Sequence, residues 1–541
     1  MKLPKKTLVT LSLCVSVTLL LIFSNVSCKN AADVSATSQL ESYLLFPEQL
    51  TPVTPYDVDT ALVNKLQANK QFAEAQRLFE ILSWQMFISL NWPVDAAGKP
   101  KPAITDPGKR IWESWKESFE IFKEDGSTPL VWGSAEDFPE KVDAKLHGTN
   151  EEDVDVLFRS SKHAALFSKK GKITGKRKLF TDTADEVNQA FTSPIWDQHG
   201  NIVRYEIRLN KPTVDYIVKN ELYNIDGQII FSKRNKVSFP SGTKDSAGSI
   251  EVKFAWREMD TTADIMDRYF TKAAYVLEKD GAFAKRIVGL VGMHISIKTK
   301  SSPQWIWSTF EHVDNLETDQ LEKVNGKPVL ASFYDPACST CPINLIPDTT
   351  KKLIKNQIQR VLPIPMATQN LNKQVQSVLK AKKSVWQYYQ LIGTQWPTDP
   401  SFPAYPVPNN PADSAIYKLP DAVVFKASGA PVPTYLTNMV METYFQGATV
   451  VGSTPATTFY NLYLANEPAY YQIQGFPSGV DKKNTLQPIF GTEGCINCHH
   501  SAGIATGDTI IAGVRTAWYG PPESGDFEWL LQLKAHFKKL P

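Results

Sequence analysis

Apolar residues in the N-terminal part of the chain recur at the spacing of a helix. The first such run begins near Asn69 and ends at Asn91-Trp92-Pro93. Its apolar positions are Phe72, Ala75, Leu78, Phe79, Leu82, Trp84, Phe87 and Leu90. A second run predicts an amphipathic helix that carries Ile111, Trp112, Trp115, Phe119 and Phe122. We expect these aromatic side chains to pack in a core.

The middle of the chain changes to the alternating pattern of half-buried strands. Residues 203–209 alternate, a short helix is predicted over 212–222, and a turn at Asp226-Gly227 precedes another apolar strand at 229–231. Three further strands are predicted, at 249–256, 284–297 and 305–313.

Helical spacing returns after the predicted strands. Residues 350–395 indicate two helical stretches, the second ending at 386–389. Helices before and after a central, mostly antiparallel sheet indicate an α+β fold class rather than a series of βαβ units. No repeat of fixed period is present.

The first 27 residues have the layout of a secretory signal. A basic start is followed by an apolar run over 8–23 and by small residues before Cys28, where a lipoprotein signal places its lipidated cysteine. Asn25 stands where such signals usually have Leu. The alternatives are an uncleaved membrane anchor and an unmodified thiol at Cys28. Residues 28–68 are polar at first and predict a tether.

The charge of the chain is close to balanced. There are 58 Lys and Arg against 56 Asp and Glu, and removal of residues 1–27 would take away three Lys and no acid, leaving a net charge of −1. This balance gives no indication of nucleic acid as a partner. The length after residue 27 is ample for a large core.

The strongest chemical signal is the segment Cys495-Ile496-Asn497-Cys498-His499. Its C-x-x-C-H spacing is that of covalent haem attachment, in which two thiols one helical turn apart bind the porphyrin and the adjacent His binds the iron. A zinc site or a disulfide is the alternative, but zinc would need further Cys or His ligands at short spacing. Export agrees with a c-type haem, because bacteria attach it outside the cytoplasm.

The residues that follow the motif contain no Met. A small cytochrome c supplies a Met ligand some tens of residues after its motif, so this segment does not resemble an appended cytochrome domain. We therefore expect a haem-binding segment, 481–541, to pack on one large domain, 69–480. The large domain would then form the second wall of the haem pocket.

Four side chains are candidates for the distal side of the haem. Met439 and Met441 precede the motif by 55–60 residues, and either thioether can complete a Met/His pair, although Met is more often core filler. His294 and His312 lie on two predicted strands, and in a hairpin their rings would share a face as distal residues or as a small metal site. The alternative for both is a hydrogen-bonded structural histidine. His500 cannot join His499 on one iron.

A second C-x-x-C pair occurs at Cys338 and Cys341, without a following His. The preceding residues superficially resemble a thioredoxin site, but a reactive dithiol needs a helix N-terminus, and Pro342 and Pro347 oppose a long helix there. We expect a structural disulfide between Cys338 and Cys341.

Several segments together resemble a family of exported, uncharacterised bacterial proteins similar to cytochrome c. The resemblance covers most of the chain after the signal and lies in the segments 84–87, 90–93, 111–115, 251–257, 307–315, 394–397, 441–444 and 526–531, together with the haem motif. It implies a haem protein and no particular substrate.

These features predict a monohaem c-type protein of the periplasm or cell envelope, held at a membrane by lipid. Electron transfer to or from a redox partner protein or a small molecule is the leading function. The alternatives are a haem-dependent oxidase or peroxidase, a haem-bearing sensor or binding lipoprotein, and a dithiol oxidoreductase centred on Cys338 and Cys341.

Overall fold

The structure is a computed structural model. The chain divides into two compact units, residues 1–47 and 48–541, and the elements below all belong to the second. The predicted signal, Cys28 and Cys498 lie outside the described residues. Those described are 44–69, 71–135, 137–139, 142, 146, 154–158, 194–278, 281–316, 323–338, 341, 343, 344, 347, 348, 350–360, 364–396, 436–443, 495, 499, 502–511, 513–520 and 524–539. Within these ranges, no helix has the length and apolar character needed to cross a membrane.

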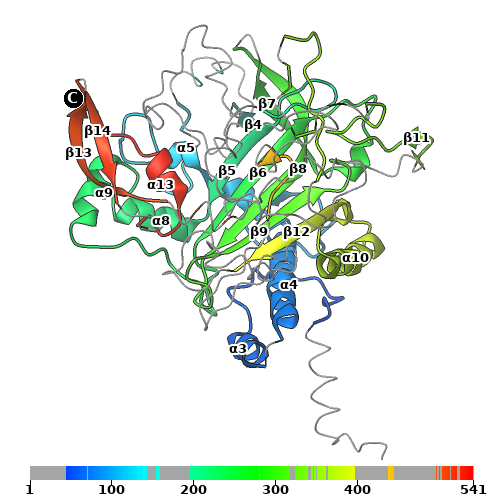
Figure 1. Cartoon of the computed structure of the whole chain (residues 1–541), viewed down its shortest axis with the longest axis horizontal. Coiled ribbons are helices and arrows are strands. Elements are labelled where there is room, and N and C mark those ends of the chain that lie inside the picture. The colour runs from blue at the N-terminus through cyan, green and yellow to red at the C-terminus, as the bar shows by residue number, and fades with distance from the viewer. Residues whose placement is uncertain are drawn as a thin grey trace, which may run out of the picture. The chain divides into compact units, whose positions relative to one another are not determined.

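Eight of the described strands form one mostly antiparallel sheet (Figure 1). Its main path runs through β12 (Tyr389–Gln395), β9 (Ile306–His312), β8 (Phe283–Ile297), β6 (Ile250–Glu258), β5 (Arg204–Leu209) and β3 (Lys116–Glu117). The long β8 also pairs with β7 (Thr271–Leu277), and β7 pairs in parallel with β4 (Asp155–Leu157).

Two helices cover one side of the β9–β12 region: α4 (Phe72–Leu90) and α10 (Met366–Ala381). Phe87 of α4 stacks on Phe310 of β9 with ring centroids 4.3 Å apart. The indole N–H of Trp84 donates to the side-chain oxygen of Asn372 in α10, at 3.0 Å. Trp84 and Phe87, two of the aromatic positions that predicted α4, thus contact the sheet through Phe310. The shorter α3 (Thr60–Ala68) precedes α4.

The C-terminal elements pack beside two helices from the middle of the chain (Figure 1). The amide oxygen of Gln228 accepts a hydrogen bond from the backbone of Ala505. Phe527 and Leu531 share an apolar cluster with Ile217 and Ile225. The elements are α8 (Lys211–Lys219), α9 (Ile225–Ser232), the hairpin of β13 (Ala505–Ile511) and β14 (Val514–Tyr519), and α13 (Trp529–Leu533). Residues far apart in sequence therefore share one core.

Short elements complete the described part. They are β1 (Pro93–Val94), β2 (Lys109–Arg110), η1 (Ile111–Ser114), α5 (Ser118–Ile121), η3 (Met266–Arg268), β10 (Lys323–Val324), β11 (Lys327–Pro328) and η4 (Val385–Tyr388).

The mixed α+β fold class agrees with the structure, and so do the predicted strands that became β5, β6, β8 and β9. Four predictions are wrong. The tether 28–68 includes α3, because Val63 and Leu66 are buried. The predicted helix over 111–122 is instead η1, β3 and α5. Residues 229–231 belong to the helix α9. Within the predicted helical region 350–395, residues 350–360 form no helix, and α10 is followed by η4 and the strand β12.

Candidate functional site

The register of β8 and β9 sorts the candidate residues onto two faces of the sheet. His294 lies opposite Thr309, and Gly292 lies opposite Glu311. Because facing residues of antiparallel strands point to the same side, these four residues share one face, which we call the polar face. Phe310 points to the other side, toward α4, and that side is called the aromatic face.

Residues 436–443 cross the polar face. The side-chain amide of Asn438 donates to the hydroxyl of Thr309 at 3.0 Å, and the backbone N–H of Met439 donates to the carboxylate of Glu311 at 2.7 Å. Gly292 permits this close approach, because a Cβ there would lie 2.8 Å from a methyl carbon of Val440. The segment is therefore fixed on β8 and β9 at several points.

The same segment carries the partner of His294. The Nε2 atom of His294 lies 2.6 Å from Oε1 of Glu442, whose other oxygen accepts from the backbone N–H of Asn438 at 2.7 Å. Burial alone would raise the pKa of Glu442, but the charges of His294 and Lys253 and the hydrogen bonds outweigh it and hold this pKa below its ordinary value. Nδ1 of His294 is buried and has no hydrogen-bond partner among the described residues.

His499 of the haem motif lies next to this face. Its ring contacts the ring of Trp307, with centroids 4.2 Å apart, and its Nδ1 lies 2.7 Å from the backbone carbonyl oxygen of Phe527. Burial lowers the pKa of His499 to about 4; the hydrogen bond to Phe527 raises it, and the nearby charges of His294 and Lys253 lower it. The ring is therefore neutral at pH 7, as a metal ligand must be.

A second set of contacts fixes the carbonyl that holds His499. The residue before Phe527 is Asp526, whose carboxylate accepts from the backbone N–H of Phe239 and pairs with Lys298. The backbone carbonyl of Asp526 accepts from the indole N–H of Trp305 at 2.9 Å. The turn that presents the Phe527 carbonyl is thus held by residues from the central sheet region.

Cys495 packs against the apolar cluster that includes Phe527, Leu530 and Trp307. His499 and Cys495 are the members of the motif that the structure describes. Across the described residues, no group of three or more His, Cys, Asp and Glu side chains is arranged to hold a metal ion. A single imidazole with covalent attachment nearby is what a haem needs from this segment, so the described residues fit that group.

His312 has a different environment, and the prediction that it shares a face with His294 is wrong. It follows Glu311 directly on β9, so it points to the opposite side of the strand. Both ring nitrogens are occupied: Nε2 lies 2.9 Å from the carbonyl oxygen of Arg268, and Nδ1 accepts from the backbone N–H of Asp314. Its ring stacks on Tyr269 at 3.8 Å. His312 has the contacts of a structural histidine.

Met439 and Met441 are both buried, in an apolar cluster that also contains Tyr205, Ala255 and Val291. Cys495 packs on a separate cluster. The structure therefore places the two thioethers as core side chains.

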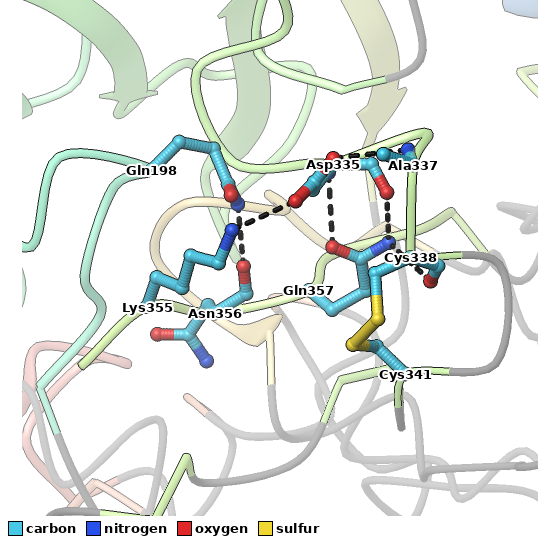
Figure 2. Close-up of a disulfide and its surroundings, with 8 residues drawn as sticks. All are labelled: Gln198, Asp335, Ala337, Cys338, Cys341, Lys355, Asn356 and Gln357. Atoms are coloured by element: carbon cyan, nitrogen blue, oxygen red, sulfur yellow. Dashed lines mark hydrogen bonds and ion pairs between the residues drawn. A yellow bond between two sulfur atoms is a disulfide. The ribbon is translucent and has the colours of Figure 1, made fainter. Parts of the chain in front are cut away.

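A disulfide joins Cys338 and Cys341, with their Cα atoms 5.3 Å apart (Figure 2). Polar contacts surround it. The carboxylate of Asp335 pairs with Lys355 at 2.7 Å, and the side-chain amide of Gln357 donates to the carbonyl of Asp335. These contacts tie the disulfide loop to the segment 350–360.

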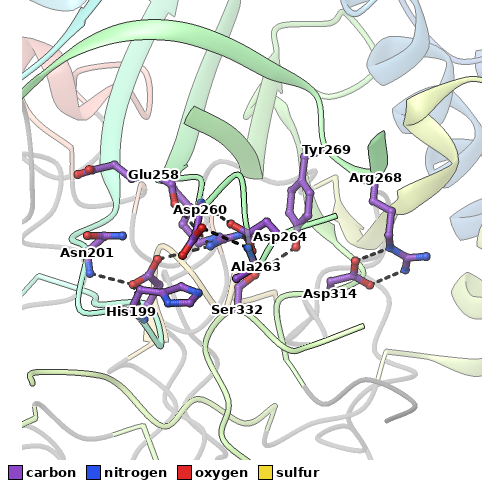
Figure 3. A network of polar contacts seen from close by, with 12 residues as sticks. His199, Asn201, Glu258, Asp260, Ala263, Asp264, Arg268, Tyr269, Asp314 and Ser332 are labelled. Carbon is purple, nitrogen blue, oxygen red and sulfur yellow. Dashed lines mark hydrogen bonds and ion pairs between the residues drawn. The ribbon is translucent and has the colours of Figure 1, made fainter. Parts of the chain in front are cut away.

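A cavity of about 210 Å³ lies near this loop, lined in part by Arg257, Asp264, Tyr269 and Asp314. Figure 3 shows the polar network around it. Asp314 binds Arg268 with two contacts of 2.6 Å, the hydroxyl of Tyr269 lies 3.2 Å from that of Ser332, and Arg257 pairs with Asp264 at 2.8 Å. Because each of these arginines is paired with an aspartate, we interpret the network as one that stabilises the fold.

The sequence marked Cys495, His499 and His294 as candidates but did not mark the residues that contact them. Trp307 lies in the predicted strand 305–313, and Glu442 and Phe527 lie in segments noted for the family resemblance, but none of the three was expected at the site. No local pattern marks them, since their roles depend on contacts across the fold.

No family model, no curated protein and no solved structure matches the chain.

Proposed function

We propose that the protein is an exported monohaem c-type redox protein whose main role is electron transfer. Cys495 and Cys498 would hold the haem through thioether bonds, and His499 would bind the iron. The family resemblance, the periplasmic location, the lipid anchor at Cys28 and a redox partner belong to the same proposal. A haem so held supplies a one-electron couple whose potential depends on its axial ligands and surroundings.

The contact between His499 and Phe527 is the observation that carries this proposal. A carbonyl oxygen can only accept a hydrogen bond, so Nδ1 of His499 must be the donor. In the neutral ring, Nε2 then has a free lone pair for a metal. Histidines that bind metals commonly have their second nitrogen fixed in this way, which sets the tautomer and the ring orientation.

The surroundings of His499 would also exclude water and hold the ring in place. Trp307 covers one side of the imidazole, and its own indole N–H is fixed by the carbonyl of Gln304 at 2.9 Å. Phe527 and Leu530 add an apolar wall beside Cys495. A rigid, largely apolar site limits reorganisation when the charge of a bound group changes.

The disulfide supports electron transfer at the haem motif over dithiol chemistry at Cys338 and Cys341. The backbone N–H of Cys341 donates to the carbonyl of Cys338, and that of Cys338 donates to the carbonyl of Asp335. These two hydrogen bonds form consecutive turns. Among the described residues between 343 and 360 there is no helix whose N-terminus would lower a thiol pKa.

The proposal is tested by producing the full chain together with a haem-attachment system. We expect one haem per chain that stays attached under denaturing conditions, measured by the pyridine haemochrome spectrum and by haem staining of a gel. The Cys495→Ser, Cys498→Ser double variant should lose it. The matched control is the Cys338→Ser, Cys341→Ser double variant, which removes the same number of thiols and should keep the haem. A wild-type protein without a Soret band, or with bound zinc in its place, would refute the proposal.

A further inference from the structure

We infer that His294 is the sixth ligand of the haem iron and that Glu442 positions it. This inference rests on the proposed function and extends it, because it assigns the side of the haem opposite His499. It requires three conditions: His294 must lie close to His499, it must have a nitrogen free to bind, and the other candidates must be worse placed.

The first condition is met by the register of the sheet. Trp307 lies opposite Ser296 and His294 lies opposite Thr309, so Trp307 and His294 are diagonal neighbours on the polar face. In antiparallel sheets such neighbours are separated by about 7–8 Å between Cα atoms. Trp307 in turn touches the ring of His499, with ring centroids 4.2 Å apart. The two imidazoles therefore share one neighbourhood.

The second condition is met by the hydrogen bonds of His294. An ionised carboxylate can only accept, so Nε2 of His294 carries the proton that is donated to Glu442 at 2.6 Å. In the neutral ring Nδ1 then has a lone pair, and this buried atom has no hydrogen-bond partner among the described residues. A buried polar atom without a hydrogen bond destabilises the fold, and a bond to a metal would remove that cost.

Glu442 is itself well fixed, and this makes it a positioning residue. Its second carboxylate oxygen accepts from the backbone of Asn438, and the side chain of Asn438 binds Thr309 on the neighbouring strand. The ring of His294 is thus clamped between its own strand and the segment that crosses the polar face. Such an outer carboxylate orients a ligating imidazole and increases its basicity.

The third condition is met by exclusion of the other candidates. Both nitrogens of His312 are hydrogen-bonded and its ring lies on the other side of β9. Met439 and Met441 lie in the apolar cluster with Tyr205. Of the four candidates from the sequence, His294 alone offers an unused donor atom beside His499. Two histidine ligands would leave no open position for peroxide or oxygen, which favours electron transfer.

The experiment compares the wild-type protein with His294→Ala, both matured with haem. Haem content by pyridine haemochrome comes first, because its absence in the wild type would refute the proposed function, and with it this inference. With haem present, we expect a low-spin wild type whose reduced Soret band does not move under carbon monoxide. His294→Ala should keep its haem, become high-spin by electron paramagnetic resonance, and bind carbon monoxide fully. Added imidazole should restore the low-spin spectrum.

Three further variants separate ligation from folding. His294→Met retains a possible ligand and should stay low-spin while gaining the sulfur-to-iron charge-transfer band, even if His294→Ala is too unstable to purify. Glu442→Gln should remain low-spin but change the reduction potential. The control His199→Ala removes a histidine that lines the cavity near the disulfide loop and should leave the spectrum unchanged. A haem-loaded His294→Ala protein that stays low-spin and inert to carbon monoxide would overturn the inference, as would a His294→Met protein without the sulfur band.

Discussion

The two faces of the sheet at β8 and β9 differ in the kind of contact that their side chains make. On the aromatic face, Phe310 stacks on Phe87 and meets Trp84 edge-on. On the polar face, His294 and Glu311 each meet a specific oxygen or N–H of the segment 436–443. Ring packing favours burial in general, whereas the polar contacts fix particular atoms in place. The aromatic face therefore supports the fold, and the polar face supports the proposed chemistry.

The histidines of adjacent strands show the same difference at the scale of one side chain. His312 uses both ring nitrogens within the protein, and His294 uses one. A fully bonded imidazole has nothing left to offer a ligand. A buried imidazole with one nitrogen unbonded can still bind another group through that nitrogen.

The largest expected effect is on the aromatic face. Phe310→Ala removes a buried ring that packs on Phe87 and Trp84, and should lower the free energy of unfolding by about 3–5 kcal/mol. The haem spectrum of the remaining folded protein should not change. Urea denaturation and the Soret band measure the two quantities on one sample. A shifted Soret band together with an unchanged stability would reverse the roles assigned to the faces.

The next effect concerns His312 and pH. Burial lowers the pKa of His312 to about 4. The charge of Asp314 and the hydrogen bond to the Arg268 carbonyl raise this pKa, whereas the charges of Arg268 and Arg257 lower it further. The unfolded chain binds a proton below pH 6.5 that the folded chain takes up only near pH 4. Stability from this group is thus fully present above pH 6.5 and is lost as pH falls toward 4, by about 3 kcal/mol.

His312→Gln isolates that contribution, because Gln does not titrate. The variant should be less stable than the wild type at pH 7, and the difference between them should shrink toward pH 4. Denaturation curves at several pH values between 7 and 4 give this difference directly. A constant difference over that range would show that His312 is not held neutral by burial.

The sequence predicted the strands well where apolar and polar residues alternate regularly, as in β8 and β9. It failed where residues that make separate tertiary contacts happen to have the spacing of a helix. Trp112 packs on Phe254 of the sheet at 4.2 Å, while Phe119 packs on Phe138, so separate contacts produced the helical spacing of 111–122. The wrong prediction of a strand at 229–231 could have been avoided from the local sequence. Asn224 caps α9 by accepting from Gly227, which is a helix-start signal readable in the sequence.

Only one part of the candidate site has a local signal in the sequence. The C-x-x-C-H spacing of Cys495, Cys498 and His499 is local, and it predicts haem attachment. Phe527 lies 28 residues from His499, and Glu442 lies 148 residues from His294. Contacts over such separations depend on how the segments pack, and no short pattern encodes them.

A smaller effect is expected at the disulfide, which belongs to neither face. It links residues three apart, so it restricts only a short loop of the unfolded chain and contributes about 2 kcal/mol in the chain-entropy model. The Cys338→Ser, Cys341→Ser double variant should unfold at slightly lower urea and keep its haem spectrum and reduction potential. A loss of redox activity with the haem intact would instead support a functional dithiol.

The smallest effect on stability, and the sharpest test of the comparison, is Trp307→Phe on the polar face. Trp307 lies three residues before Phe310 on the same strand, so the two variants probe opposite faces of β9. Phe keeps most of the ring contact and loses the N–H that binds the carbonyl of Gln304, a cost of about 1 kcal/mol. Because this ring covers His499, the reduction potential and the axial-ligand signals of the haem should change although unfolding hardly does. If Trp307→Phe lowers stability as much as Phe310→Ala and leaves the haem signals untouched, the division of labour between the faces is wrong.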